Sequence, residues 1–170
     1  MEFAQLAKER YSVRKFQNRP VEKALLAQVI HAGRVAPTAC NNQPQKVYVL
    51  QSEDALEKLK KCTTCHFNAP AALLICYDRN ISWKRSFDGK DSGFVDASIV
   101  TTHMMLQAHE LGLGTTWVMY FDPNETVLQF ELPENIVPVA ILPIGYPAED
   151  AKPAPMHEKI REEAETVEYR

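Results

Sequence analysis

The chain has 170 residues, of which 45% are hydrophobic and 24% are charged, and its formal net charge at pH 7 is −3. This length and composition predict a single domain over residues 1–170 with its own hydrophobic core. They exclude collagen-like, low-complexity and largely disordered chains. The small negative charge offers no electrostatic basis for binding nucleic acid or an anionic membrane, and no apolar run reaches the roughly 20 residues that cross a bilayer.

The N-terminus and the cysteines bear on the location of the protein. The segment Met1-Glu2-Phe3 is acidic and lacks the apolar core of a secretory signal. We therefore expect Cys40, Cys62, Cys65 and Cys76 to be reduced thiols rather than a disulfide framework. The expected location is the cytoplasm.

Hydrophobic periodicity predicts that helices and strands alternate along the chain. The predicted helices span residues 2–9, 21–35, 53–61, 94–111 and 124–130, and the predicted strands span 46–51, 71–77, 115–120 and 137–144. The continuous apolar run at 71–77 is typical of a strand that is buried on both faces. Pro138 and Pro143 interrupt the last strand and favour an edge or irregular position for it. The elements do not follow the order of regular βαβ units, so we expect a mixed α+β fold.

Two segments lack helical or strand periodicity. Residues 36–44 contain two prolines and several turn formers, and we expect them to form a loop. Residues 148–157 are polar and extended, and a charged helical turn and a β-like stretch at 166–169 follow them. Such a tail is too polar to fold back on its own core, so we expect it to lie along a partner subunit.

Arg10-Tyr11-Ser12-Val13-Arg14 is the first candidate binding motif. Two guanidinium groups four residues apart around a hydroxyl group can hold a phosphate through charge-assisted hydrogen bonds. A solvated turn with two surface arginines is the alternative, and spacing alone favours that alternative.

Leu111-Gly112-Leu113-Gly114-Thr115-Thr116-Trp117 is the second candidate. Glycines between a buried helix and a strand let the backbone approach a flat ligand closely, and the strand then offers N–H donors. These glycines follow a helix and precede a strand, which is the reverse of the order in a dinucleotide-binding fingerprint. A simple helix C-cap explains them equally well.

Cys62-Thr63-Thr64-Cys65-His66 matches the attachment motif of c-type haem. Covalent haem attachment requires export, for which the chain shows no signal, and a redox Cys-x-x-Cys motif would open a helix rather than follow one. One such pair gives only half of a zinc site, even with His66 or His103 nearby. We therefore favour an incidental loop and expect no metal site.

No residue pattern indicates a catalytic nucleophile: the chain lacks a Ser/His/Asp set, an acidic pair and a phosphate-binding P-loop. Lys159 and Arg161 place two basic groups in the tail, although neighbouring glutamates make a solvated charge cluster the simpler interpretation. Taken alone, these features support an α+β domain with a candidate phosphate site.

Together and in order, four segments resemble the nitroreductase family of FMN-dependent oxidoreductases. The matching segments are 10–16, 36–44, 112–117 and 143–147, with the sequences RYSVRKF, APTACNNQP, GLGTTW and PIGYP. The resemblance implies a mostly antiparallel sheet flanked by helices. It also implies an intertwined homodimer with FMN at the interface and the C-terminal tail on the partner.

The resemblance further implies three groups of cofactor-binding residues. The phosphate and ribityl chain of FMN would be held by Arg10, Tyr11, Ser12, Arg14, Lys159 and Arg161. The second subunit would reach the flavin through Pro37, Thr38 and Ala39, while Asn41 and Gln43 would face the ring system. The segment running past the ring would be Trp117, Val118, Met119 and Tyr120, with a backbone N–H of Met119 or Tyr120 aimed at flavin N5.

By this resemblance, the protein would transfer hydride from NAD(P)H through the flavin to a small-molecule acceptor such as a nitroaromatic, a quinone or an activated alkene. No side chain would act as a catalytic nucleophile. Met119 and Tyr120 are bulkier than the small residues of many relatives and would narrow the substrate pocket. The alternative function is that of an FMN-binding carrier or redox sensor without significant turnover.

Overall fold

The computed structural model describes residues 2–170. Its helices are α1 (Phe3–Glu9), α2 (Lys23–Arg34), α3 (Glu53–Cys62), α4 (Gly93–Glu110), α5 (Pro123–Gln129) and α6 (Glu163–Thr166), with a short 3₁₀ turn, η1, at Ala39–Asn41. Its strands are β1 (Gln45–Leu50), β2 (Ala71–Asp78), β3 (Gly114–Thr115) and β4 (Ile136–Gly145). The five helices expected before residue 131 are confirmed, with ends that differ by one or two residues.

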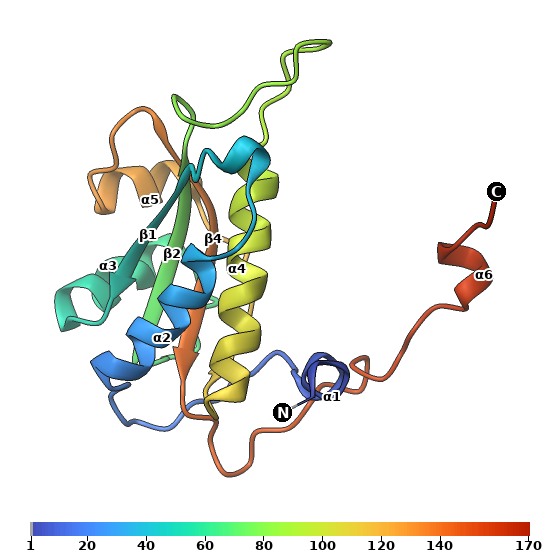
Figure 1. The fold of residues 1–170 in the computed structure, drawn as a ribbon. Coiled ribbons are helices and arrows are strands. Elements are labelled where there is room, and N and C mark those ends of the chain that lie inside the picture. Colours follow the sequence, from blue (N-terminus) through green and yellow to red (C-terminus); the bar gives the residue numbers. More distant parts are fainter. Residues whose placement is uncertain (1) are drawn as a thin grey trace.

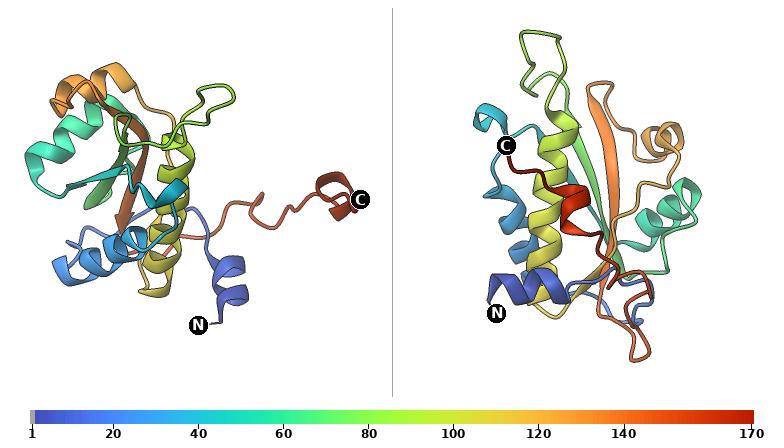
Figure 2. Two further views of the ribbon diagram at one scale, coloured as in Figure 1. Left: turned by 45° about the horizontal axis from the view of Figure 1, so that its top comes forward. Right: turned by 90° about the vertical axis from the view of Figure 1, so that its right-hand side faces the viewer.

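The strands form a sheet in the order β1-β2-β4-β3, and every neighbouring pair is antiparallel. Helices α2 and α4 cover one face of this sheet, and α3 and α5 cover the other, as Figure 1 and the right-hand view of Figure 2 show. This arrangement confirms the α+β fold with a mostly antiparallel sheet flanked by helices.

Strand β2 is buried on both faces, as its continuous apolar run predicts. Leu73 and Ile75 belong to the core under α2 and α4, whereas Leu74 and Cys76 belong to the core under α3 and α5. Successive side chains of a strand point to opposite faces, so one run of apolar residues supplies both cores.

Of the two alternatives expected for the last strand, the edge position is wrong, because β4 lies between β2 and β3, whereas the expected irregularity is present as a β-bulge in its pairing with β2. Ile141 exchanges two backbone hydrogen bonds with Val118, each with an N···O distance of 2.9 Å. The backbone N–H and C=O groups of alternate residues in a strand point toward the same neighbouring strand, so those of residue 143, like those of Ile141, point toward β3 and the chain that follows it. Between Thr115 and Val118 that chain does not pair with β4. The missing N–H of Pro143 therefore costs no sheet hydrogen bond. Pro138 lies next to a β-bulge, where proline is also tolerated.

The strand expected at 115–120 is shorter than predicted. Regular pairing stops at Thr115, and Val118 forms only an isolated bridge to Ile141. Beyond Val118 the chain turns tightly, since the N–H of Phe121 donates to the carbonyl oxygen of Met119 at 3.1 Å. Apolar, β-branched residues predicted a strand here because hydrophobic patterning does not register such a turn.

Helix α4 packs closely against α2. A Cβ added at Gly33 of α2 would lie 2.7 Å from Cγ of Met104, so a larger residue there would require the Met104 side chain to move. Phe94 and Val95, at the start of α4, remain exposed in the single chain. Within residues 2–170, no helix is long and apolar enough to cross a membrane. The cytoplasmic location stays a prediction.

The C-terminal tail leaves the body of the protein after β4. Figure 1 shows it running outward to α6, far from the sheet. Every residue from Glu158 to Arg170 is exposed in the single chain. The charged helical turn is present as α6, whereas the β-like stretch at 166–169 forms no strand. The described side-chain contacts of residues 158–170 are local ones within the tail, such as Arg161 with Glu165 and Tyr169 with Glu163, and none joins these residues to the body of the chain.

Candidate functional site

The segment from Arg10 to Arg14 is fixed by main-chain contacts. The N–H of Val13 donates to the carbonyl oxygen of Thr115 at 2.9 Å, and Ser12 forms a parallel bridge with the same residue. The two segments are so close that a Cβ added at Gly114 would lie 2.5 Å from Cγ2 of Val13. The close backbone approach expected at these glycines therefore involves the chain itself. These main-chain contacts hold Ser12, Arg10 and Arg14 in place and leave the side chains of the three residues free of that task.

The guanidinium of Arg10 contains a buried atom that lacks a partner. Within residues 2–170, Nη1 of Arg10 is buried and forms no hydrogen bond. The side chain of Arg14 is exposed and donates from Nη1 to the carbonyl oxygen of Ser12 at 3.2 Å. A buried N–H donor without an acceptor is costly, so this segment retains capacity for an anionic ligand.

A small pocket opens beside this segment and is cationic overall. Its volume is about 210 Å³, and its walls include Ser12, Arg14, Lys15, Asp150 and Lys152. The ammonium of Lys15 pairs with the carboxylate of Asp150, which leaves Arg14 and Lys152 as uncompensated charges. The first part of the tail thus contributes one wall of the pocket.

The tail reaches this region through Tyr11. The Tyr11 hydroxyl donates to the carbonyl oxygen of Ala151 at 3.4 Å, and its ring meets that of His157 edge-on, with centroids 6.3 Å apart. Lys159 follows two residues later and is exposed, whereas Nε of Arg161 pairs with Glu165 at 3.0 Å. The structure therefore brings the tail to the Arg10–Arg14 segment, although no described contact joins Lys159 or Arg161 to it.

The loop from Pro37 to Gln43 has a strained backbone. Cys40, Asn41 and Gln43 have φ angles of 50°, 55° and 51°, in the left-handed region that side chains disfavour. The N–H of Gln43 donates to Oγ1 of Thr38 at 3.0 Å and closes the loop on itself. Pro37, Asn41 and Gln43 are exposed at its surface.

This loop is tied to α4 by a buried carboxylate. The N–H of Ala39 donates to Oδ1 of Asp96 at 2.9 Å, and Oγ of Ser92 donates to Oδ2 of Asp96 at 2.7 Å. Asp96 is 2% exposed. Sequence reasoning did not identify Asp96, although an acidic residue in the apolar stretch that begins α4 was a usable signal.

The two segments lie at opposite ends of α4. The loop at 37–43 meets the first turn of this helix, whereas the segment at 10–14 pairs with β3, beyond the last turn. An 18-residue helix is about 27 Å long at about 1.5 Å per residue. Figure 1 shows this separation. Within one chain, the structure does not bring these two predicted groups together.

The segment from Trp117 to Tyr120 runs along the free side of β4. Trp117 packs partly against the core and Val118 is buried, whereas Met119 and Tyr120 are 58% and 75% exposed. Within residues 2–170, the N–H groups of Met119 and Tyr120 donate no hydrogen bond. Both are therefore available to a ligand.

The Cys-x-x-Cys-His segment at 62–66 lies beside the stretch of chain that contains Tyr120 and Asp122. Cys62 is the last residue of α3, so the motif follows a helix as expected. Burial raises the pKa of the Cys62 thiol. No group of three or more metal-ligating side chains occurs within residues 2–170.

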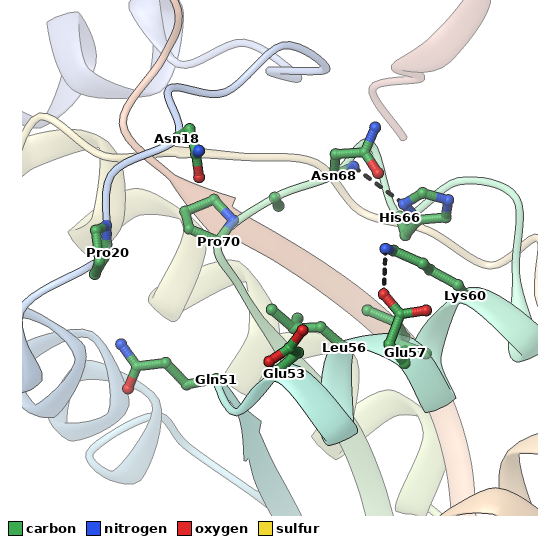
Figure 3. A pocket seen from close by; sticks show the side chains of 12 residues that line it. Asn18, Pro20, Gln51, Glu53, Leu56, Glu57, Lys60, His66, Asn68 and Pro70 are labelled. Atoms are coloured by element: carbon green, nitrogen blue, oxygen red, sulfur yellow. Dashed lines mark hydrogen bonds and ion pairs between the residues drawn. The ribbon is translucent and has the colours of Figure 1, made fainter.

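A separate pocket of about 370 Å³ lies between α3 and the turn that precedes β2 (Figure 3). In it, Lys60 pairs with Glu57, and Nδ1 of His66 accepts a hydrogen bond from the N–H of Asn68 at 3.1 Å. Burial, with a smaller contribution from Lys60, lowers the pKa of His66. None of the sequence-predicted cofactor-binding residues lines this pocket.

Comparison with known proteins identifies the family. The sequence profile of the nitroreductase family matches residues 7–72 and 66–146. A curated relative from Methanothermobacter thermautotrophicus is 30% identical over 159 residues, which cover 88% of this chain and 80% of the relative. The FMN reductase [NAD(P)H] of Bacillus subtilis is also 30% identical, over 85% of this chain and 65% of its own.

Solved structures agree with this assignment. A nitroreductase family protein from Clostridium difficile 630 superposes with a TM-score of 0.94 at 45% identity, over 99% of this chain and 98% of its own. A protein from Exiguobacterium sibiricum, solved in complex with FMN, shares the fold with a TM-score of 0.88 at 18% identity, over 100% of this chain and 98% of its own. Both the sequence profile and the fold therefore lead to one conclusion: the chain belongs to the nitroreductase family.

Proposed function

We propose that the chain is an FMN-dependent oxidoreductase that takes electrons from NAD(P)H and passes them to an electron-poor acceptor. The observation that carries this proposal is the buried Nη1 of Arg10, which lacks an acceptor in the described chain. A phosphate oxygen forms a strong, charge-assisted hydrogen bond with such a donor. Membership of the nitroreductase family, with an FMN reductase among the relatives, points to FMN as the source of that phosphate.

The residues at 10–14 suit the phosphate end of FMN. Arg10 and Arg14 would neutralise the phosphate, and the hydroxyl of Ser12 would hold it or the ribityl chain. Arg14 is free to turn toward a ligand, since its described hydrogen bond is only to the neighbouring carbonyl of Ser12. Lys159 and Arg161 would complete the phosphate contacts from the tail, which Tyr11 already holds nearby.

The residues at 37–43 would come from a second copy of the chain. One chain keeps this loop and the segment at 10–14 at opposite ends of α4, so a site that uses both needs two chains in opposite orientation. A groove of about 510 Å³ between α1, α2 and α4 supports such an assembly, because exposed apolar side chains, Phe3 and Val35 among them, line it. Pro37, Thr38 and Ala39 would then reach the cofactor of the partner, with Asn41 and Gln43 facing its ring.

The ring end of the site requires a hydrogen-bond donor and a dry surface. FMN, when bound, supplies the ring that accepts and releases hydride. The chain contributes the unpaired N–H of Met119 or Tyr120, which would hold the ring nitrogen N5 in a fixed orientation. The partly buried Trp117 and the buried Val118 would anchor the segment that carries this donor.

The first experiment is to purify the full chain and record its visible spectrum, its native mass and its FMN content after denaturation. We expect a yellow dimer with about one FMN per chain, as two identical sites in a twofold dimer require. Oxidation of NADH and NADPH is then followed with a nitroaromatic, a quinone and an activated alkene as acceptors.

The same experiment separates the competing functions. Yellow protein with negligible turnover on all three acceptors would favour an FMN carrier or redox sensor. A Soret band in place of flavin bands would indicate haem on Cys62–His66. Colourless protein that takes up no added FMN would contradict the proposal.

A further inference from the structure

Thr63 is a buried hydroxyl that joins two distant segments of the chain. Its side chain is only 5% exposed. Oγ1 of Thr63 donates a hydrogen bond to the carbonyl oxygen of Tyr120 and accepts one from the N–H of Cys65 at 2.9 Å. A second tie lies alongside, since the N–H of Asp122 donates to the carbonyl oxygen of Cys62 at 2.9 Å.

These bonds hold one peptide unit at both ends. The peptide between Tyr120 and Phe121 offers its carbonyl oxygen to Thr63 and its N–H to the carbonyl oxygen of Met119 at 3.1 Å. The second bond joins residues i and i+2 and closes a γ-turn centred on Tyr120. Rotation of this peptide would break both bonds, so the hydroxyl of Thr63 fixes the turn.

The γ-turn determines the direction of the N–H group of Tyr120. In a planar trans peptide, the N–H points opposite to the carbonyl of the same unit. The carbonyl of Met119 points into the turn toward Phe121, so the N–H of Tyr120 points out of it. This N–H donates no hydrogen bond within residues 2–170, and the Tyr120 side chain is 75% exposed.

We propose that Thr63 is a positioning residue for hydride transfer, because its hydroxyl fixes the γ-turn that aims the N–H of Tyr120 at the reacting ring of the flavin. This inference rests on the proposed function. It predicts that the hydroxyl of Thr63 alone fixes the γ-turn. The neighbouring Thr64 should have no such role, because it is exposed and forms no described hydrogen bond.

The test compares Thr63→Val with Thr63→Ser and with the control Thr64→Val. Valine keeps the shape of threonine but removes the hydroxyl, whereas serine retains it. Each FMN-loaded variant is measured for FMN affinity, for the limiting rate of flavin reduction by NADPH and for the flavin absorption spectrum. Should Thr63→Val not fold, Thr63→Cys replaces it, since a thiol is a much weaker donor of similar size.

We expect Thr63→Val to bind FMN within about twofold of the parent affinity, to shift the flavin spectrum and to lower the limiting reduction rate about tenfold. This is less than the roughly 10²- to 10³-fold cost of removing an oriented donor, because the N–H of Tyr120 is still present and only loses its fixed direction. Thr63→Ser and Thr64→Val should keep the parent rate. A Thr63→Val protein that melts earlier but reduces its flavin at the parent rate would show a merely structural role and overturn the inference. A Thr63→Val protein that no longer binds FMN would also overturn the inference.

Failure of the proposed function gives a different result. An inactive parent protein would remove both conclusions, whereas an active parent with an unchanged Thr63→Val rate removes only the role of Thr63.

Discussion

The segment at 10–14 and the loop at 37–43 are held in place in different ways. The first is fixed by its backbone, through the bond from Val13 to Thr115 and the bridge from Ser12. The second has three left-handed residues and is tied to the body by the carboxylate of Asp96. Side chains at 10–14 can therefore change without moving the segment, whereas one substitution on α4 should release the loop.

The largest expected effect is that of Asp96→Ala. It leaves the N–H of Ala39 and the hydroxyl of Ser92 without their acceptor, so we expect the free energy of unfolding to fall by about 2–6 kcal/mol, the cost of two unsatisfied groups. Urea denaturation measures this change. Asp96→Asn keeps an acceptor and should lose less. Equal stability of Asp96→Ala and the parent would show that the carboxylate does not hold the loop.

Gly114→Ala should displace the segment at 10–14 without touching an arginine. Its new Cβ would lie 2.5 Å from Cγ2 of Val13, and overpacking of this kind costs about 1–3 kcal/mol. Gly112→Ala is the control, since Gly112 has a φ of 77° but open space around it. Thermal melting should show that both variants are destabilised. Only Gly114→Ala should also bind FMN more weakly, and equal FMN affinity in the two variants would contradict the arrangement.

Arg14→Ala tests the side chains alone. Arg14 is exposed and its segment is held by backbone contacts, so the melting temperature should not change. Loss of a charge-assisted hydrogen bond to phosphate should raise the Kd for FMN about 10- to 100-fold. Titration of the apoprotein with FMN measures this, with Arg34→Ala on α2 as the control. An Arg14→Ala protein that binds FMN as tightly as the parent would rule out the phosphate role.

The smallest expected effect is the contribution of Glu22 to the pH dependence of stability. The hydroxyl of Tyr146 and, more weakly, Arg19 lower the pKa of Glu22 from 4.5 to about 2. A lowered pKa in the folded state stabilises the fold above pH 4.5, and this contribution disappears as the pH falls toward 2. The melting temperature of the parent should therefore drop more between pH 6 and pH 3 than that of Glu22→Gln. Parallel pH profiles would contradict this role of Glu22.

The sequence predicts local features of this fold better than contacts between distant segments. The continuous apolar run at 71–77 indicated that β2 is buried on both faces, because this signal lies within the strand itself. The internal position of β4 was missed, since the neighbour that Pro143 faces cannot be known from patterning. Family resemblance supplied the candidate site residues. It gave no sign of Asp96 or Thr63, which contact Ala39 and Tyr120, each 57 residues away in the chain.

The central claim is that each FMN lies between the 10–14 segment of one chain and the 37–43 loop of another. Subunit complementation tests it most directly. One chain carries Arg10→Ala and Arg14→Ala, and a differently tagged chain carries Pro37→Glu and Asn41→Asp, two exposed positions whose new carboxylates would repel FMN. Neither variant should bind FMN alone.

Co-expression and purification through both tags then isolates the mixed dimer. If the site is shared between chains, one of its two sites combines an intact 10–14 segment with an intact 37–43 loop, and about one FMN per dimer should be recovered. A mixed dimer that holds no FMN, from chains that each fold and dimerise, would show that the site is not built from these two segments of different subunits.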